Sequence, residues 1–288
     1  MTFSSNISAA EEVSGSQHPI VSQVNFYLAG LTLLPICCLG VICNSLVVAV
    51  LTRKSMKSSI SSFLLALALY DTLLLVCTVL TVCLEPLSVT YRLHVLPQIL
   101  PYVYPVAVTA QTCTIWITVS FTVERFAAIR YPLEVSVRCT ARRAKVICAG
   151  ISVASVLYNA SRWFEMSVEP VMGPNGTAVL VPRTQLRSFV NIPTELGSNQ
   201  LYERIYYTGL YLSVMSAIPI FLLVTLNSFL ILTVHRARAD SVAMGNGRPN
   251  KEQSTTVMLV VVVLVFILCQ VRKTNILKIS AKFTACDS

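Results

Sequence analysis

The residues best suited to chemistry are an adjacent acid and base, Glu124 and Arg125, at the end of an apolar stretch. The stretch runs from 110 to 132, reads AQTCTIWITVSFTVERFAAIRYP, and closes with Tyr131 and Pro132. A carboxylate and a guanidinium at the rim of an apolar helix form an ion pair that a partner can open. The pattern therefore predicts a switch at a helix end, and the plainer alternative is a pair that snorkels to a membrane surface.

Two further polar residues lie within apolar runs. Asn44 stands in GVICNS, and Asp71 follows LALALY. A carboxylate at the centre of a bilayer costs about 2.5–3.5 kcal/mol on insertion scales. We expect either a hydrogen-bonded pair between two helices or a cation or proton site that faces the interior. Asn44, Asp71 and Thr114 supply only part of the oxygen ligands that a sodium ion needs, so we expect no metal and no other cofactor.

Composition identifies the medium around these residues. Hydrophobic residues make up 55% of the 288 residues and charged residues only 12%, with a mean hydropathy of +0.69. A soluble core of this size could not hide so much apolar surface. The net charge of +9 comes from bases in short clusters between apolar runs, without the interleaved aromatics of a nucleic-acid interface. The chain is therefore predicted to reside in a lipid bilayer.

The apolar runs and the bases around them predict the topology. We expect membrane helices at 24–51, 59–84, 98–130, 144–164, 205–234 and 255–271, the last being the shortest. With the N-terminus outside, the inner loops hold twelve Lys and Arg and the outer connections five, which agrees with the positive-inside rule. Residues 1–23 are polar, contain the sequon at Asn6 and lack the pattern of a cleaved signal peptide.

Other classes of membrane protein fit less well. A transporter would need internal repeats and broken helices that meet at the midplane, and the three prolines Pro35, Pro105 and Pro219 do not occur in matching halves. An enzyme is not expected, because the histidines lie in loops or at helix ends and no phosphate loop is present. A multi-pass transporter or a non-signalling membrane protein remains the alternative hypothesis.

In this order and spacing, the motifs resemble the rhodopsin-like (class A) G-protein-coupled receptors over residues 24–271. The resemblance implies an all-α, multi-pass membrane helix bundle: an extracellular N-terminus at 1–23, five full helices with a partial sixth at 24–271, and a non-family basic tail at 272–288. It also implies that Glu252 holds Arg125 and that Arg125 contacts a G protein once released. The residues that carry it are Asn44, Leu67, Ala68, Asp71, Glu124, Arg125, Phe126, Tyr131, Pro132 and Pro219.

Within that family, the chain is similar to FMRFamide-type neuropeptide receptors. The similarity lies in Tyr104-Pro105, the 110–126 stretch, LYNASRWFE at 157–165 and FILCQV at 266–271. It implies an amidated peptide ligand ending in Arg-Phe-amide, whose cation would pair with acids at a partly desolvated rim. The plainer alternative is that rim acids are solvated and rim aromatics form an interfacial belt. The implied ligand-binding residues are Glu85, Tyr104, Gln111, Glu165, Tyr206 and Gln270.

Two departures from the family shape the remaining expectations. The disulfide between the third helix and the second outer loop is absent, because Leu100 stands where the helix cysteine is expected and no cysteine occurs from 149 to 268. The loop at 165–204 must then be held by contacts alone. Arg272 replaces the proline of helix six and no helix seven follows, so we expect a truncated, spliced or incomplete form with impaired signalling.

The resemblance also implies partners and modifications. The expected partners are a peptide ligand, a heterotrimeric G protein, the lipid bilayer and a full-length copy of the receptor, at the plasma membrane. Glycosylation is expected at Asn6 and Asn175. A third sequon begins at Asn159, but its place at a helix end next to lipid argues against modification.

Overall fold

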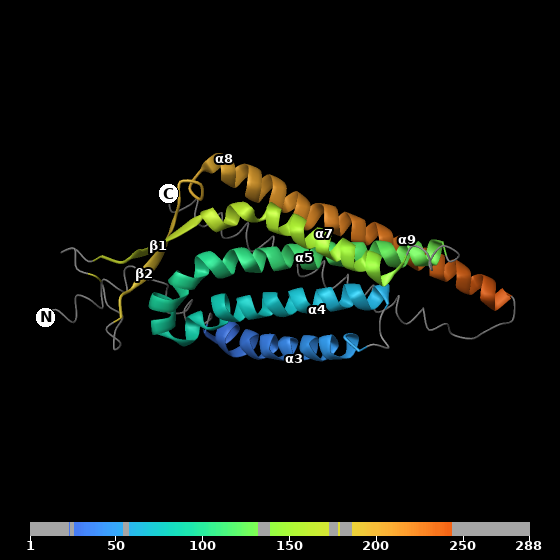
Figure 1. Cartoon of the computed structure of the whole chain (residues 1–288), viewed down its shortest axis with the longest axis horizontal. Helices are drawn as coiled ribbons and strands as arrows, with labels where there is room; N and C mark the ends of the chain where they lie inside the picture. The colour runs from blue at the N-terminus through green and yellow to red at the C-terminus, as the bar shows by residue number, and fades with distance from the viewer. Residues whose placement is uncertain are drawn as a thin grey trace. The chain divides into compact units, whose positions relative to one another are not determined.

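The computed structural model describes residues 23, 26–53, 58–131, 139–172, 178 and 186–243, and nearly all of them are helical (Figure 1). Where η marks π-helical or 3-10 segments, the elements are η1 (Phe26–Leu33), α3 (Leu34–Leu51), α4 (Ser59–Thr78), η3 (Val79–Cys83), η4 (Glu85–Leu87), η5 (Tyr91–Val95), α5 (Leu96–Arg130), α7 (Ala141–Tyr158), η7 (Ala160–Phe164), β1 (Met166–Pro170), β2 (Phe189–Pro193), α8 (Gln200–Tyr202), η8 (Glu203–Tyr211), η9 (Ser213–Ala217) and α9 (Ile218–Ala243).

Five helices among the described residues are long and apolar enough to cross a membrane. Five of the six predicted membrane helices are thereby confirmed, and the sixth, at 255–271, lies outside the described residues. A bilayer favours this architecture because a helix satisfies its backbone hydrogen bonds internally. By length and composition, the candidate spans are Phe26–Leu51, Ser59–Leu87, Tyr91–Arg130, Ala141–Phe164 and Gln200–Phe229.

The third helix begins at Tyr91 rather than at residue 98. The polar residues Arg92 and His94 lower the hydropathy of its first turn, although the helical backbone continues through η5 into α5. Pro101 and Pro105 lie inside α5 without ending it. Prolines are tolerated in membrane helices because neighbouring groups can satisfy the freed carbonyls.

The chain divides into two compact units. In the first, formed by residues 1–117 and 141–206, α4 packs against both α3 and α7. Gly40 lets α3 approach α4 closely, since a Cβ added there would lie 2.8 Å from Leu75 Cδ1. Phe63 is fully buried at 0% exposure. This unit holds the polar network around Arg162 that is described below.

The second unit comprises residues 118–140 and 207–288. Within its described part, Leu223 of α9 is buried at 0% exposure and Met215 of η9 at 1%. The rings of Phe126 and Phe229 lie with centroids 6.4 Å apart. The end of α5 and the middle of α9 are therefore in contact inside this unit.

A β-hairpin occupies the described parts of the segment predicted only as a loop. β1 and β2 pair antiparallel, with Met166 opposite Pro193 and Pro170 opposite Phe189. Val171 continues this pairing, is buried at 6% exposure and packs against Val190. The predicted helix bundle is confirmed, and the hairpin is an addition to it.

Candidate functional site

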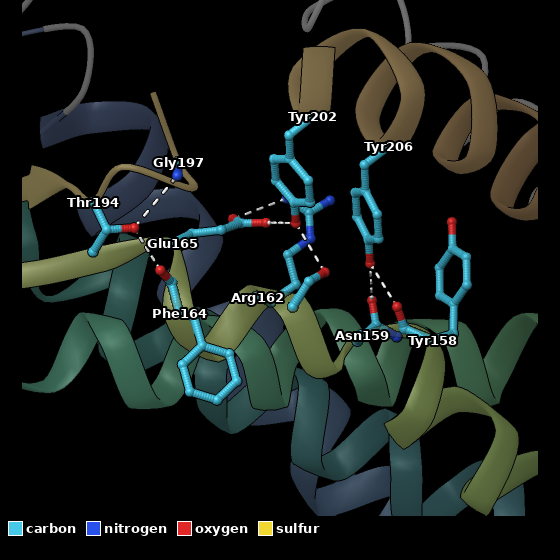
Figure 2. A network of polar contacts seen from close by, with 10 residues as sticks. Tyr158, Asn159, Arg162, Phe164, Glu165, Thr194, Gly197, Tyr202 and Tyr206 are labelled. Atoms are coloured by element: carbon cyan, nitrogen blue, oxygen red, sulfur yellow. Dashed lines mark hydrogen bonds and ion pairs between the residues drawn. The ribbon is translucent and has the colours of Figure 1, made fainter. Parts of the chain in front are cut away.

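The first feature of the site is a buried ion pair where α7 ends (Figure 2). Arg162 of η7 donates from Nη1 to Glu165 Oε2 across 3.2 Å, and the two side chains are only 1% and 3% exposed. The spacing of three residues places both groups on one side of the turn. A pair buried this deeply depends on both partners, because removing either one leaves an uncompensated charge.

Aromatic side chains enclose this ion pair. The Tyr206 ring centroid lies 4.5 Å from Arg162 Cζ, and the Tyr104 ring centroid lies 5.9 Å from the same atom. Tyr202 donates its hydroxyl hydrogen to Glu165 Oε1. Figure 2 shows Tyr202 and Tyr206 reaching from α8 and η8 toward the end of α7. The guanidinium therefore sits between a carboxylate and two aromatic faces, which is a favourable site for a planar cation.

Asn159 lies at the base of this network. Its Nδ2 donates to Thr112 Oγ1 at 2.9 Å and to the Ser155 backbone oxygen at 2.8 Å. The residue is 0% exposed. The expectation that this sequon is not modified agrees with the buried, hydrogen-bonded amide.

The hairpin is held without a disulfide. Thr194 donates from its backbone nitrogen to the Glu165 backbone oxygen at 2.9 Å, and its hydroxyl donates to the backbone oxygen of Phe164. On the other side, His94 Nδ1 donates to the Arg187 backbone oxygen at 2.7 Å. The His94 ring also contacts the Phe189 ring, with centroids 5.5 Å apart. These contacts tie the described parts of the loop to the residues before it and to η5.

Gly197 allows the close approach of the segment that follows the hairpin. A Cβ added at this position would overlap the backbone oxygen of Glu165, which cannot rotate away. Gly197→Ala is therefore expected to destabilise the protein by about 1–3 kcal/mol, the usual cost of overpacking. Gly150→Ala is the matched control, since nothing lies within 4 Å of its added Cβ. The midpoint of denaturant unfolding in mixed micelles measures the stability of the two variants. Equal midpoints for Gly197→Ala and Gly150→Ala would contradict this prediction.

The predicted switch pair lies in the second unit. Arg125 Nη2 donates to Glu124 Oε1 at 3.3 Å, and the side chains are 16% and 11% exposed. The guanidinium also lies over the Phe121 ring, 5.5 Å from its centroid. Tyr131 is exposed, whereas Pro132 and Glu252 lie outside the described residues. The pair itself is confirmed, and the latch to Glu252 stays a prediction.

The intramembrane carboxylate has an internal partner. Thr114 Oγ1 donates to Asp71 Oδ1 at 2.9 Å, which joins α5 to α4. Asn44 lies half-buried on α3. Among the described residues, no group of three or more His, Cys, Asp or Glu side chains could hold a metal ion. Of the two readings of Asp71, the hydrogen-bonded pair between helices fits this geometry.

The predicted ligand-binding residues divide into two groups. Tyr104, Glu165 and Tyr206 come together around Arg162, so Glu165 already has a cation. Glu85 lies half-buried on η4 and Gln111 half-buried on α5. Gln270 and the glycosylation sites Asn6 and Asn175 lie outside the described residues. The roles assigned to all of these residues stay predictions.

Sequence reasoning missed two parts of the network, the pairing of Arg162 with Glu165 and the contribution of Tyr202. Arg162 was counted as an outer base and as part of the 157–165 stretch, although Glu165 follows it at the spacing of a helical ion pair. Tyr202 and Tyr206 are four residues apart, which places them on one helix face. No comparable signal pointed to His94, whose partners lie about ninety residues away in the chain.

Comparison with known proteins gives one family match. The model of the rhodopsin family of seven-transmembrane receptors matches residues 43–287. The chain is 28% identical to the FMRFamide receptor of Drosophila melanogaster over 253 residues, which cover 86% of this chain and 45% of that protein. It is 30% identical to the FMRFamide peptide receptor frpr-18 of Caenorhabditis elegans over 216 residues, which cover 72% of this chain and 46% of that protein.

A third relative gives a longer match. The protein named Probable G-protein coupled receptor frpr-1, of Caenorhabditis elegans, is 28% identical over 271 residues, which cover 86% of this chain and 66% of that protein. The chain thus spans between 45% and 66% of the length of these relatives.

Proposed function

The chain belongs to the rhodopsin family of seven-transmembrane receptors, and we propose that it is a neuropeptide receptor of the FMRFamide type. The observation that carries this proposal is the similarity to an FMRFamide receptor through 86% of the chain. Family membership and five apolar helices make the chain a multi-pass membrane protein. The proposed ligand is an amidated peptide ending in Arg-Phe-amide, and the proposed signalling partner is a heterotrimeric G protein. The chain would lie in the plasma membrane with its N-terminus outside.

The outer ends of the helices support a ligand of this chemistry. Glu85 on η4 and Tyr104 on α5 supply an acid and an aromatic ring, and both are half-buried. A carboxylate at a partly desolvated rim binds a guanidinium by charge-assisted hydrogen bonds. An aromatic face binds either the same cation or the phenylalanine ring. We propose that Glu85, Tyr104 and Gln111 contact the peptide.

The end of α5 supports coupling to a G protein. Arg125 is held by its neighbour Glu124 and by the Phe121 ring. A guanidinium paired with a single neighbouring carboxylate can exchange that partner for another acceptor that offers the same charge-assisted hydrogen bond. We propose that Arg125 contacts the G protein when the receptor is active, and that Glu252 holds it at other times.

The test places the whole chain in cell membranes and measures both peptide binding and nucleotide exchange on added G proteins. The probes are the amidated peptide Phe-Met-Arg-Phe and its free-acid form. The amidated peptide should bind at least about tenfold more tightly, because the free acid adds a charge that must be desolvated. If the chain binds neither peptide, the proposed function is wrong.

Arg125→Ala separates coupling from binding. It should abolish nucleotide exchange and leave peptide binding within about twofold of wild type, because Arg125 lies outside the polar network around Arg162. The control is Arg53→Ala, which removes an exposed arginine after α3. Exchange that survives in the Arg125→Ala variant would refute the coupling role of this residue.

A further inference from the structure

The surroundings of Arg162 combine an acid with aromatic rings, which together suit a guanidinium group. Glu165 Oε2 lies 3.2 Å from Nη1. The Tyr206 ring lies at 4.5 Å and the Tyr104 ring at 5.9 Å from Cζ. We call Glu165, Tyr202, Tyr206 and Tyr104 the cage. A carboxylate combined with aromatic faces selects a planar, delocalised cation over a compact, strongly hydrated ammonium.

The walls of the cage have contacts that do not involve Arg162. Tyr202 donates to Glu165 Oε1, and its ring stacks on Tyr206 with centroids 5.3 Å apart. Tyr206 stacks on Tyr158 at 5.6 Å and donates its hydroxyl hydrogen to the Tyr158 backbone oxygen at 2.9 Å. These contacts would keep the carboxylate and the rings in place when the guanidinium is removed.

Arg162 itself is buried, but it lies next to exposed residues at the end of a helix. The residue lies on the short 3-10 helix η7 at the end of a membrane span. The two residues that follow are exposed, Trp163 at 44% and Phe164 at 68%. A long arginine side chain at a span end can extend to the membrane surface and keep its charge in water.

We propose that the cage is a guanidinium-binding site that Arg162 occupies in this structure and that the arginine of a bound peptide takes over. The second half of this statement rests on the proposed function. The exchange replaces one guanidinium by another, so Glu165 stays paired throughout and no buried carboxylate is left uncompensated. Arg162 thereby acts as an internal competitor of the ligand.

The first experiment tests the cage without any peptide. Purified Arg162→Ala protein in lipid nanodiscs should melt at a lower temperature than wild type, and methylguanidinium at about 10 mM should restore about half of the loss by binding the folded form. Methylammonium at the same concentration should restore none. Arg142→Ala, which removes an exposed arginine from α7, should show neither the loss nor the rescue. A folded Arg162→Ala protein that methylguanidinium does not stabilise would overturn the proposal.

The second experiment uses Arg162→Lys, which keeps a cation beside Glu165 and is available if the alanine variant does not fold. Its probes are Arg-Phe-amide and the same dipeptide with neutral citrulline in place of arginine. Because an ammonium fits the cage less well than a guanidinium, Arg-Phe-amide should bind this variant about tenfold more tightly than wild type. The citrulline peptide should bind both proteins equally.

The outcomes separate the two proposals. The proposal of ligand exchange in the cage is wrong if Arg-Phe-amide binds wild type and Arg162→Lys with equal affinity. It is also wrong if the citrulline peptide gains as much affinity for Arg162→Lys as Arg-Phe-amide does. In either case the proposed function stands. If neither dipeptide nor the longer amidated peptide binds any variant, the proposed function fails, and rescue by methylguanidinium still decides whether the cage accepts a free guanidinium.

Discussion

Glu165→Gln is expected to lower the free energy of unfolding by roughly 3–5 kcal/mol, the usual cost of breaking a buried ion pair on one side. The side chain is 3% exposed and holds Arg162, which is 1% exposed, so the arginine would keep its charge without its counter-ion. Glutamine has nearly the same shape as glutamate and could still accept the hydrogen bond from the Tyr202 hydroxyl. The substitution therefore changes mainly the charge. Unfolding in mixed micelles, followed by circular dichroism, measures the loss.

Glu169→Gln is the matched control for this prediction. Glu169 belongs to β1, the same hairpin that follows Glu165, and it is exposed. An exposed charge contributes little to stability, so this variant should unfold like wild type. The double variant Arg162→Met with Glu165→Leu should recover most of the loss, because replacing both charges removes the desolvation cost of each. A single Glu165→Gln variant as stable as wild type would show that the pair does not hold the fold.

Phe63→Ala is expected to cost roughly 3 kcal/mol, at the lower end of large-to-small substitutions in a core. Phe63 lies on α4 at 0% exposure, so its removal leaves a cavity between helices. In a bilayer the lost contact is mainly packing, because lipid is as apolar as the protein interior. Most of the cost therefore comes from the van der Waals contacts that the residues lining the cavity lose.

Leu69→Ala on the same helix is the control for the cavity. Leu69 is 53% exposed within a candidate membrane span, so its side chain loses few protein contacts. Leu69→Ala should lower the free energy of unfolding by less than about 1 kcal/mol, measured in the same denaturant. Equal losses for Phe63→Ala and Leu69→Ala would mean that α4 is not packed on the side where Phe63 lies.

For Glu165, the sequence indicated the kind of group that pairs with the acid but not where in the molecule that group comes from. The sequence predicted that an acid at this position pairs with a guanidinium, and the structure supplies one from within the chain, Arg162. A ligand arginine therefore has to compete for Glu165.

The amino-acid sequence by itself determined the membrane helices and the residue pair at the end of α5. Lipid requires each spanning segment to satisfy its own backbone, so the length and apolarity of a run predict a helix without knowledge of its neighbours. Glu124 and Arg125 are adjacent in the chain, and their contact needs no tertiary arrangement. The family resemblance rests on the same local motifs, and the family match agrees with it.

Only the tertiary structure decided which polar groups meet around Arg162. The cage joins Glu165 to tyrosines about forty residues later and to Tyr104 on another helix, and the hairpin is held by His94 from η5. Such pairings depend on how helices pack and where a loop returns, and residue spacing does not encode either. The physical reason is that burial made these contacts strong: the same arginine and acid in water would form a weak pair.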